Sequence, residues 1–137
     1  MSFRAISIIP ILRIFSIEKA REFYVDYLGF HLDWEHRFEP DLPLYMQVSR
    51  DGLVLHLSEH YGDGSPGAHF HIDIEGVREL HAELAAKNYG YLRPGLENDS
   101  HWGTVQLCLI DPFGNKLDFG ERKQKNDAAP DQWNAPR

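Results

Sequence analysis

Apolar and polar side chains follow the same order twice along this chain. Residues 6–14 form an isoleucine-rich run that predicts a first strand. Ser16 then precedes apolar residues at helical spacing over 17–28, and Gly29 follows them, which predicts a capped helix with a defined end. Residues 30–36 alternate apolar and polar side chains, as a half-buried strand does. Residues 44–49 and 53–60 predict a hairpin across Asp51 and Gly52.

The second half repeats this plan sixty positions later, where Ile14 falls on Ile74 and Ile17 on Val77. It predicts a strand over 68–74, a helix over 77–87, a short strand near Tyr91 and Leu92, a loop over 94–101, and a hairpin of 104–110 with 116–120. The pattern predicts an α+β fold of two paired strand-helix-strand-strand-strand modules, 6–60 and 68–121, whose curved sheets surround a groove. Both lie in one domain, 1–121. A Gly- and Pro-rich joint, 61–67, connects them, and 122–137 form a polar tail.

Composition excludes several classes of function. The 137 residues carry a formal net charge of −7, which argues against a nucleic-acid partner and favours cationic ligands. The single cysteine, Cys108, rules out an internal disulfide and fits a reducing compartment, and its apolar strand setting predicts a structural thiol. The sequence contains no run of about 20 apolar residues, the length that spans a bilayer. We therefore expect a cytoplasmic protein with no membrane partner.

The turn Asp111-Pro112-Phe113-Gly114-Asn115, the Phe23-Tyr24 pair followed by Leu28-Gly29-Phe30, and the two-fold plan resemble the vicinal oxygen chelate superfamily over about residues 6–121. Its members include glyoxalase I, extradiol dioxygenases, and fosfomycin- and bleomycin-resistance proteins. Residues 9–13 and 102–104 look most like the bleomycin-resistance branch. That resemblance implies a homodimer that sequesters a bulky cationic glycopeptide antibiotic without changing it.

The catalytic members of the superfamily hold a divalent metal through four strand positions. By motif, these positions fall on Ile9, His56, His69 and Asp118 in this chain. Ile9 has no donor atom, and Asp118 is shorter than the usual Glu, so we expect no native metal and no cofactor. The alternative is a metal-dependent lyase or dioxygenase in which His56, His69 and Asp118 hold iron, zinc, manganese or nickel.

The resemblance also suggests where the ligand lies. Aromatic side chains of bleomycin-resistance proteins clamp a flat part of the drug, and imidazoles line the groove. The expected ligand-binding residues are Trp102, Phe38, Trp34, His56, His69, His71 and Asp118. Two alternatives stay open: Trp34 is a core residue if the alternation with Phe30 and Leu32 continues, and the imidazoles either only line the groove or make binding depend on pH.

Two further expectations concern the surface. Acidic side chains near the expected groove would attract a cation, or else are ordinary solvated charges; they are Glu35, Glu39, Asp41, Glu59, Asp63 and Asp99. A half-open sheet would expose Val105, Leu107 and Leu109, and this exposure predicts that two copies associate. The sequence thus favours a small-molecule binding protein.

Overall fold

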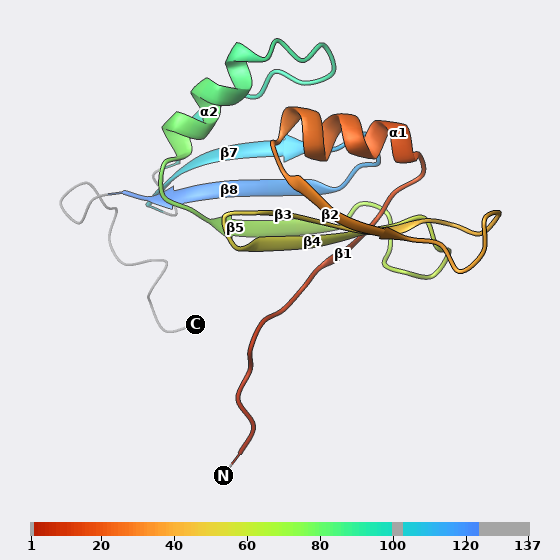
Figure 1. Ribbon diagram of the computed structural model, residues 1–137. Coiled ribbons are helices and arrows are strands. Elements are labelled where there is room, and N and C mark those ends of the chain that lie inside the picture. The colour runs from red at the N-terminus through yellow and green to blue at the C-terminus, as the bar shows by residue number, and fades with distance from the viewer. Residues whose placement is uncertain (1, 100–102, 124–137) are drawn as a thin grey trace. The chain divides into compact units, whose positions relative to one another are not determined.

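The computed structural model describes residues 2–99 and 103–123 (Figure 1). The first half contains β1 (Ile11–Arg13), α1 (Ile17–Ala20), the π-helical η1 (Arg21–Tyr27), β2 (His31–His36), β3 (Tyr45–Arg50) and β4 (Leu53–Ser58). The second half contains β5 (His69–Asp73), α2 (Val77–Ala86), β6 (Leu96–Asp99), β7 (Thr104–Ile110) and β8 (Lys116–Arg122). The chain divides between Pro66 and Gly67 into two compact units.

Each unit contains one four-stranded sheet, and the two sheets have equivalent strand orders. The first is β1-β4-β3-β2 and the second is β5-β8-β7-β6. In both, the strand that precedes the helix pairs in parallel with the last strand of the unit, and the other pairs are antiparallel. The predicted α+β class and the two strand-helix-strand-strand-strand modules are confirmed.

Local signals set the ends of the first helix as predicted. The Ser16 hydroxyl accepts a hydrogen bond from the Lys19 backbone N–H at 3.1 Å, which satisfies one free donor of the first turn. After α1 the backbone widens into η1, where Leu28 N–H bonds to the Phe23 carbonyl five residues back. Gly29 then takes a φ of 74°, which ends the helix.

The turns between paired strands also agree with the sequence. Asp51 and Gly52 have φ values of 50° and 81°, as a two-residue hairpin requires. In the turn before β8, the Asp111 carboxylate accepts backbone N–H bonds from Phe113 and Asn115, each at 2.8 Å. The Asn115 side-chain oxygen accepts a bond from Ala68 N–H, so this turn also holds the start of β5.

Two predicted strands are placed differently. The first strand covers only Ile11–Arg13 instead of 6–14. Pro10 has no N–H to donate, so only its carbonyl contacts β4, where it accepts a hydrogen bond from His56 N–H, and the paired strand begins at the next residue. The prediction of a short strand near Tyr91 is wrong. The strand is β6, Leu96–Asp99, inside the predicted loop, where the outer edge of β7 supplies its hydrogen-bond partners.

The prediction that a half-open sheet exposes Val105, Leu107 and Leu109 is also wrong, so these residues give no reason to expect a dimer. Val105 is 7% exposed, and Leu107 and Leu109 are fully buried within the single chain. Helix α2 lies over β7 and β8 and covers this face (Figure 1). The start of α2 is held against β8 as well, because the Glu121 carboxylate accepts the N–H groups of Gly76 and Val77. Among the described residues, no helix has the length and apolarity needed to cross a membrane.

Candidate functional site

A β-bulge in β2 decides which face of the first sheet carries Trp34. Leu32 pairs with Val48, but Trp34 pairs with Gln47, so Asp33 is the extra residue. A register change of one residue moves each following side chain to the opposite face. Trp34 therefore leaves the buried face of Val48 and joins that of Gln47, where it is 42% exposed. The core interpretation of Trp34 is wrong for this physical reason.

Trp34 belongs to a group of rings on this face, which we call the aromatic face; its rings are Trp34, His36, Phe38, Tyr45, His56 and His60. Trp34 and Tyr45 are stacked at 12° with centroids 6.0 Å apart, and the Trp34 and His56 rings meet edge-on at 5.4 Å. Phe38 lies 6.2 Å from His60 and is 72% exposed. Exposed, stacked rings of this kind offer a flat apolar ligand an aromatic surface.

Two of these rings belong to a continuous set of hydrogen bonds, the Tyr45–Asp33 chain, made of Tyr45, His56, Gln47 and Asp33. Tyr45 Oη lies 2.6 Å from His56 Nδ1, and His56 Nε2 lies 2.9 Å from Gln47 Oε1. The Gln47 amide N–H donates to Asp33 Oδ2 at 3.0 Å. Both ring nitrogens of His56 are therefore engaged by protein groups.

The charge states along this chain follow from its contacts. Hydrogen bonds from Gln47, His31 and Ser49 lower the pKa of Asp33 to about 2, so Asp33 is ionised at neutral pH. Burial lowers the pKa of His56 and thus favours its neutral form. Burial, and then the charge of Asp63, raise the pKa of Tyr45, whose hydroxyl keeps its proton.

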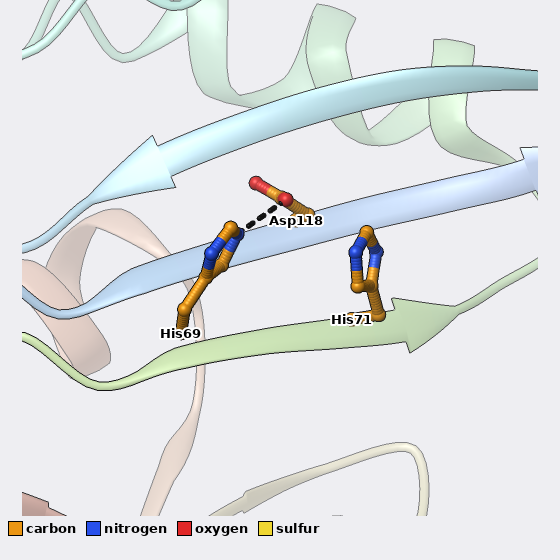
Figure 2. A group of neighbouring side chains, drawn as sticks. All are labelled: His69, His71 and Asp118. Atoms are coloured by element: carbon orange, nitrogen blue, oxygen red, sulfur yellow. Dashed lines mark hydrogen bonds and ion pairs between the residues drawn. The ribbon is translucent and has the colours of Figure 1, made fainter. Parts of the chain in front are cut away.

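The second unit carries a separate polar group, the His69–Asp118 cluster, made of His69, His71 and Asp118. Figure 2 shows both imidazoles rising from β5 toward the carboxylate on β8. His69 Nε2 is 2.6 Å from Asp118 Oδ2, and the ligand atoms of all three residues lie within 4.8 Å of one another. Strand alternation puts His69 and His71 on one face, and the β5–β8 register sets His71 beside Asp118.

Asp118 is the buried member of this cluster. It is 8% exposed, and its Oδ1 is buried without a hydrogen-bond partner among the described residues. Burial alone raises the pKa of Asp118, but the interactions with Cys108 and His69 outweigh burial and lower it. Cys108 is an exposed residue on this face, but its sulfur is partly desolvated. This partial burial, followed by the interaction with Asp118, raises the pKa of the thiol to about 11.

The donor set of this cluster fits a divalent transition metal, because two imidazoles and a carboxylate with an unused oxygen suit zinc or ferrous iron. It differs from the predicted set. His71 takes part, whereas His56 has both nitrogens occupied in the first unit.

The predicted ligand-binding residues thus gather in two places. Trp34, Phe38 and His56 share the aromatic face, and His69, His71 and Asp118 form the cluster. The prediction for Trp102 falls outside the described residues.

Sequence reasoning missed Tyr45 and Gln47, and it treated Cys108 only as a structural thiol, whereas the residue is exposed beside Asp118. The alternation with buried Leu107 and Leu109 was a signal that Cys108 faces outward. The roles of Tyr45 and Gln47 depend on the register with His56, for which the sequence carried no separate signal.

Comparisons with known proteins agree with this architecture. The chain resembles a bleomycin-binding protein complexed with bleomycin, with 20% identity, a TM-score of 0.66, and 87% of this chain and 100% of the other covered. It also resembles a bleomycin resistance determinant encoded on transposon Tn5, with 20% identity, a TM-score of 0.67, and coverage of 88% and 100%. These likenesses support the fold.

A third similar structure is a member of the glyoxalase/bleomycin resistance protein/dioxygenase superfamily from Sphaerobacter thermophilus, with 21% identity, a TM-score of 0.62, and coverage of 87% and 98%. No curated protein sequence matches the chain. A family model described as "Glyoxalase superfamily protein" matches residues 2–126. The match spans both repeats, and the chain therefore belongs to the glyoxalase superfamily.

Proposed function

We propose that this chain is a binding protein that holds a small organic ligand with a flat ring and a positive charge, without changing it chemically. The observation that carries the proposal is the exposed Trp34 ring stacked on Tyr45 at the aromatic face. Burying such a ring against a ligand ring adds about 0.5–1.5 kcal/mol beyond the burial of area. The net charge of −7 favours a cation.

A bleomycin-like cationic glycopeptide is the ligand class we propose, which would make the chain an antibiotic-resistance protein. It rests on the fold shared with a bleomycin-binding protein that was crystallised with bleomycin. The occupied nitrogens of His56 support binding without metal chemistry, since neither is open to a metal while its hydrogen bond lasts. Ile9, at the first metal position of the superfamily, has no donor atom.

The test is a titration of the protein with metal-free bleomycin, read by calorimetry and by tryptophan fluorescence. We expect saturable binding that weakens in Trp34→Ala and is largely kept in Trp34→Phe. Tyr61→Ala is the matched control, because Tyr61 is a 96% exposed ring in the joint between the units. No heat at high micromolar drug, or equal affinity in Trp34→Ala, would contradict the proposal.

A second candidate function is a metal-dependent lyase or dioxygenase. The observation that favours it is the His69–Asp118 cluster with its unpartnered, buried Asp118 oxygen. A resident metal there would act as a Lewis acid toward a bound oxygen ligand. Metal analysis of protein prepared without an affinity tag separates the two functions. A stoichiometric ion that disappears in His71→Ala would favour the enzyme.

We propose further that the protein is a homodimer located in the cytoplasm. Phe3, Ile6 and Ile8 are 90%, 79% and 91% exposed, and this apolar run gives a second copy a surface to cover. Light scattering at micromolar concentration tests the dimer, and a monomer would contradict it. The single cysteine supports a reducing compartment.

A further inference from the structure

The hydrogen-bond directions in the Tyr45–Asp33 chain can be assigned from one end to the other. Asp33 is ionised and can only accept, so the Gln47 group that faces it is the amide N–H. Gln47 then turns its carbonyl oxygen toward His56, and the nearby His56 Nε2 must carry the hydrogen. The Asp33 carboxylate thereby fixes which way the Gln47 amide points, which the contact with His56 alone leaves ambiguous.

The same logic continues to Tyr45. Because the neutral imidazole carries one hydrogen and it is on Nε2, His56 Nδ1 is an acceptor. The Tyr45 hydroxyl, 2.6 Å away, therefore donates to it. All three bonds run in one direction, toward the Asp33 carboxylate. Hydrogen bonds aligned in this way polarise one another, so the negative end of the chain increases the electron density on Tyr45 Oη.

We propose that Tyr45 is the polar contact of the aromatic face, and that the Tyr45–Asp33 chain makes its oxygen an acceptor for an N–H group beside the flat ring of the ligand. This inference rests on the proposed function and narrows it. The preferred ligand is an amino-bearing aromatic cation, not merely any flat cation. The hydroxyl hydrogen is already used by His56, so a ligand that offers only acceptors gains nothing at this position.

The surroundings of Tyr45 agree with this preference. Its ring is nearly parallel to the Trp34 ring with centroids 6.0 Å apart, so a ligand ring that lies along both side chains can place a substituent at the Tyr45 hydroxyl. The carboxylate of Asp63 acts electrostatically on Tyr45 and adds negative potential. The His60 ring lies 6.4 Å from the Tyr45 ring. A ligand N–H that carries positive charge meets an acceptor here, in a region of negative potential.

Two flat cationic probes separate this inference from the proposed function. Proflavine carries amino N–H groups, whereas N-methylacridinium has the same ring system and charge but no N–H. We expect the protein to bind proflavine roughly tenfold more tightly, the scale of one net hydrogen bond to a charged group. In Tyr45→Phe this preference should vanish while both probes still bind. Tyr61→Phe, the same change at an exposed ring, should keep it.

Asp33 is the end of the Tyr45–Asp33 chain away from the proposed ligand contact, so a variant there tests the hydrogen-bond chain without changing that contact. Asp33→Asn should reduce the preference for proflavine several-fold, while Asp26→Asn, which removes the same charge from an exposed position on η1, should not. Nitrogen NMR should find His56 in the wild-type protein with its hydrogen on Nε2, and in Gln47→Leu with a mixture of tautomers.

The outcomes are distinguishable. Equal affinity for the two probes in the wild-type protein would overturn the inference and leave the proposed function standing. If neither probe bound, the inference would fail, and the bleomycin titration would decide the proposed function. A His56 hydrogen on Nδ1 in the wild-type protein would overturn the inference whatever the probes do, because Tyr45 would then be the acceptor from His56.

Discussion

Asn115 Oδ1 accepts a hydrogen bond from the backbone N–H of Ala68 across 3.2 Å and thus joins the turn before β8 to the start of β5. The same side chain donates from Nδ2 to Asp111 Oδ2 at 2.8 Å. Asn115 and Asp111 are buried, and Ala68 is half-buried, so the Asp111 oxygen in particular is shielded from water. This one amide therefore links two strands that are far apart in sequence, next to the bond from Lys116 N–H to the Ala68 carbonyl.

Replacing Asn115 by Ala should destabilise the protein by about 2–3 kcal/mol, because a buried Asp111 oxygen and the half-buried Ala68 N–H would both lose this partner. Urea unfolding followed by circular dichroism measures the change. Lys116→Ala is the control, since Lys116 is exposed and surface substitutions usually stay within about 0.5 kcal/mol. A loss of stability no larger than in that control would contradict this role for Asn115.

The features of the fold that sequence analysis predicted correctly depend on local chemistry. Ser16, Gly29 and the Asp51–Gly52 turn act within a few residues of themselves, so their effect can be inferred without knowing the tertiary partner. β6 depends on a distant partner. Leu96–Asp99 carry little strand preference, and this segment becomes a strand because the edge of β7 offers hydrogen bonds.

The candidate site was predicted in part for the same reason. The resemblance to the superfamily identified His56, His69 and Asp118 as candidate ligand or metal contacts, but the hydrogen-bond partners of these side chains depend on strand register. The bulge at Asp33 is invisible in a sequence where Phe30, Leu32 and Trp34 keep strict alternation, because β3 determines where the extra residue sits. His56 meets Gln47 only through the β3–β4 pairing, which no local pattern predicts.

The stability of the protein should depend on the protonation of His56. Its folded-state pKa is lowered by burial, so below about pH 6.5 the unfolded chain binds a proton that the folded chain resists. Stability therefore falls as the pH drops from about 6.5 toward the folded pKa of His56 and is retained above this window.

NMR titration should give His56 a pKa below about 6.5. The His56→Gln variant should lose less stability than the wild-type protein over the same range. A His56 pKa at or above the ordinary value would contradict this prediction.

Protein prepared without an affinity tag should contain no stoichiometric divalent metal, as the sequence predicted. Ile9 offers no donor, and His56 would have to give up a bond to Tyr45 or Gln47. Elemental analysis of the purified protein checks this. The His69→Ala and His56→Ala variants then identify the donors of any metal that is found. An ion near one per chain that is lost in His69→Ala but kept in His56→Ala would instead support the enzyme with its metal in the His69–Asp118 cluster.

Cys108 should react slowly with alkylating reagents despite its exposure. Its pKa of about 11 leaves little thiolate at pH ~8, and the thiolate is the reactive form. Burial is the larger cause of this shift, and Asp118 adds to it, so Asp118→Asn should speed iodoacetamide labelling several-fold. Glu97→Gln removes a more weakly acting charge and should give a smaller increase. Mass spectrometry measures the rates, and an unchanged rate in Asp118→Asn would mean that burial alone suppresses the thiol.

Bleomycin binding should weaken as salt is added, because screening shortens the reach of the negative charge that attracts a cationic drug. Calorimetry at low and high ionic strength measures this effect. Trp34→Ala should weaken binding by roughly 1–3 kcal/mol at both salt concentrations, since the loss of an aromatic contact is apolar and is little screened. We predict a loss of the same size for Trp102→Ala, on the sequence resemblance alone. If Trp34→Ala binds normally while Trp102→Ala does not, the drug lies away from the aromatic face. If salt has no effect, charge contributes little to recognition, and the case for a cationic ligand is lost even though the ring contact stands.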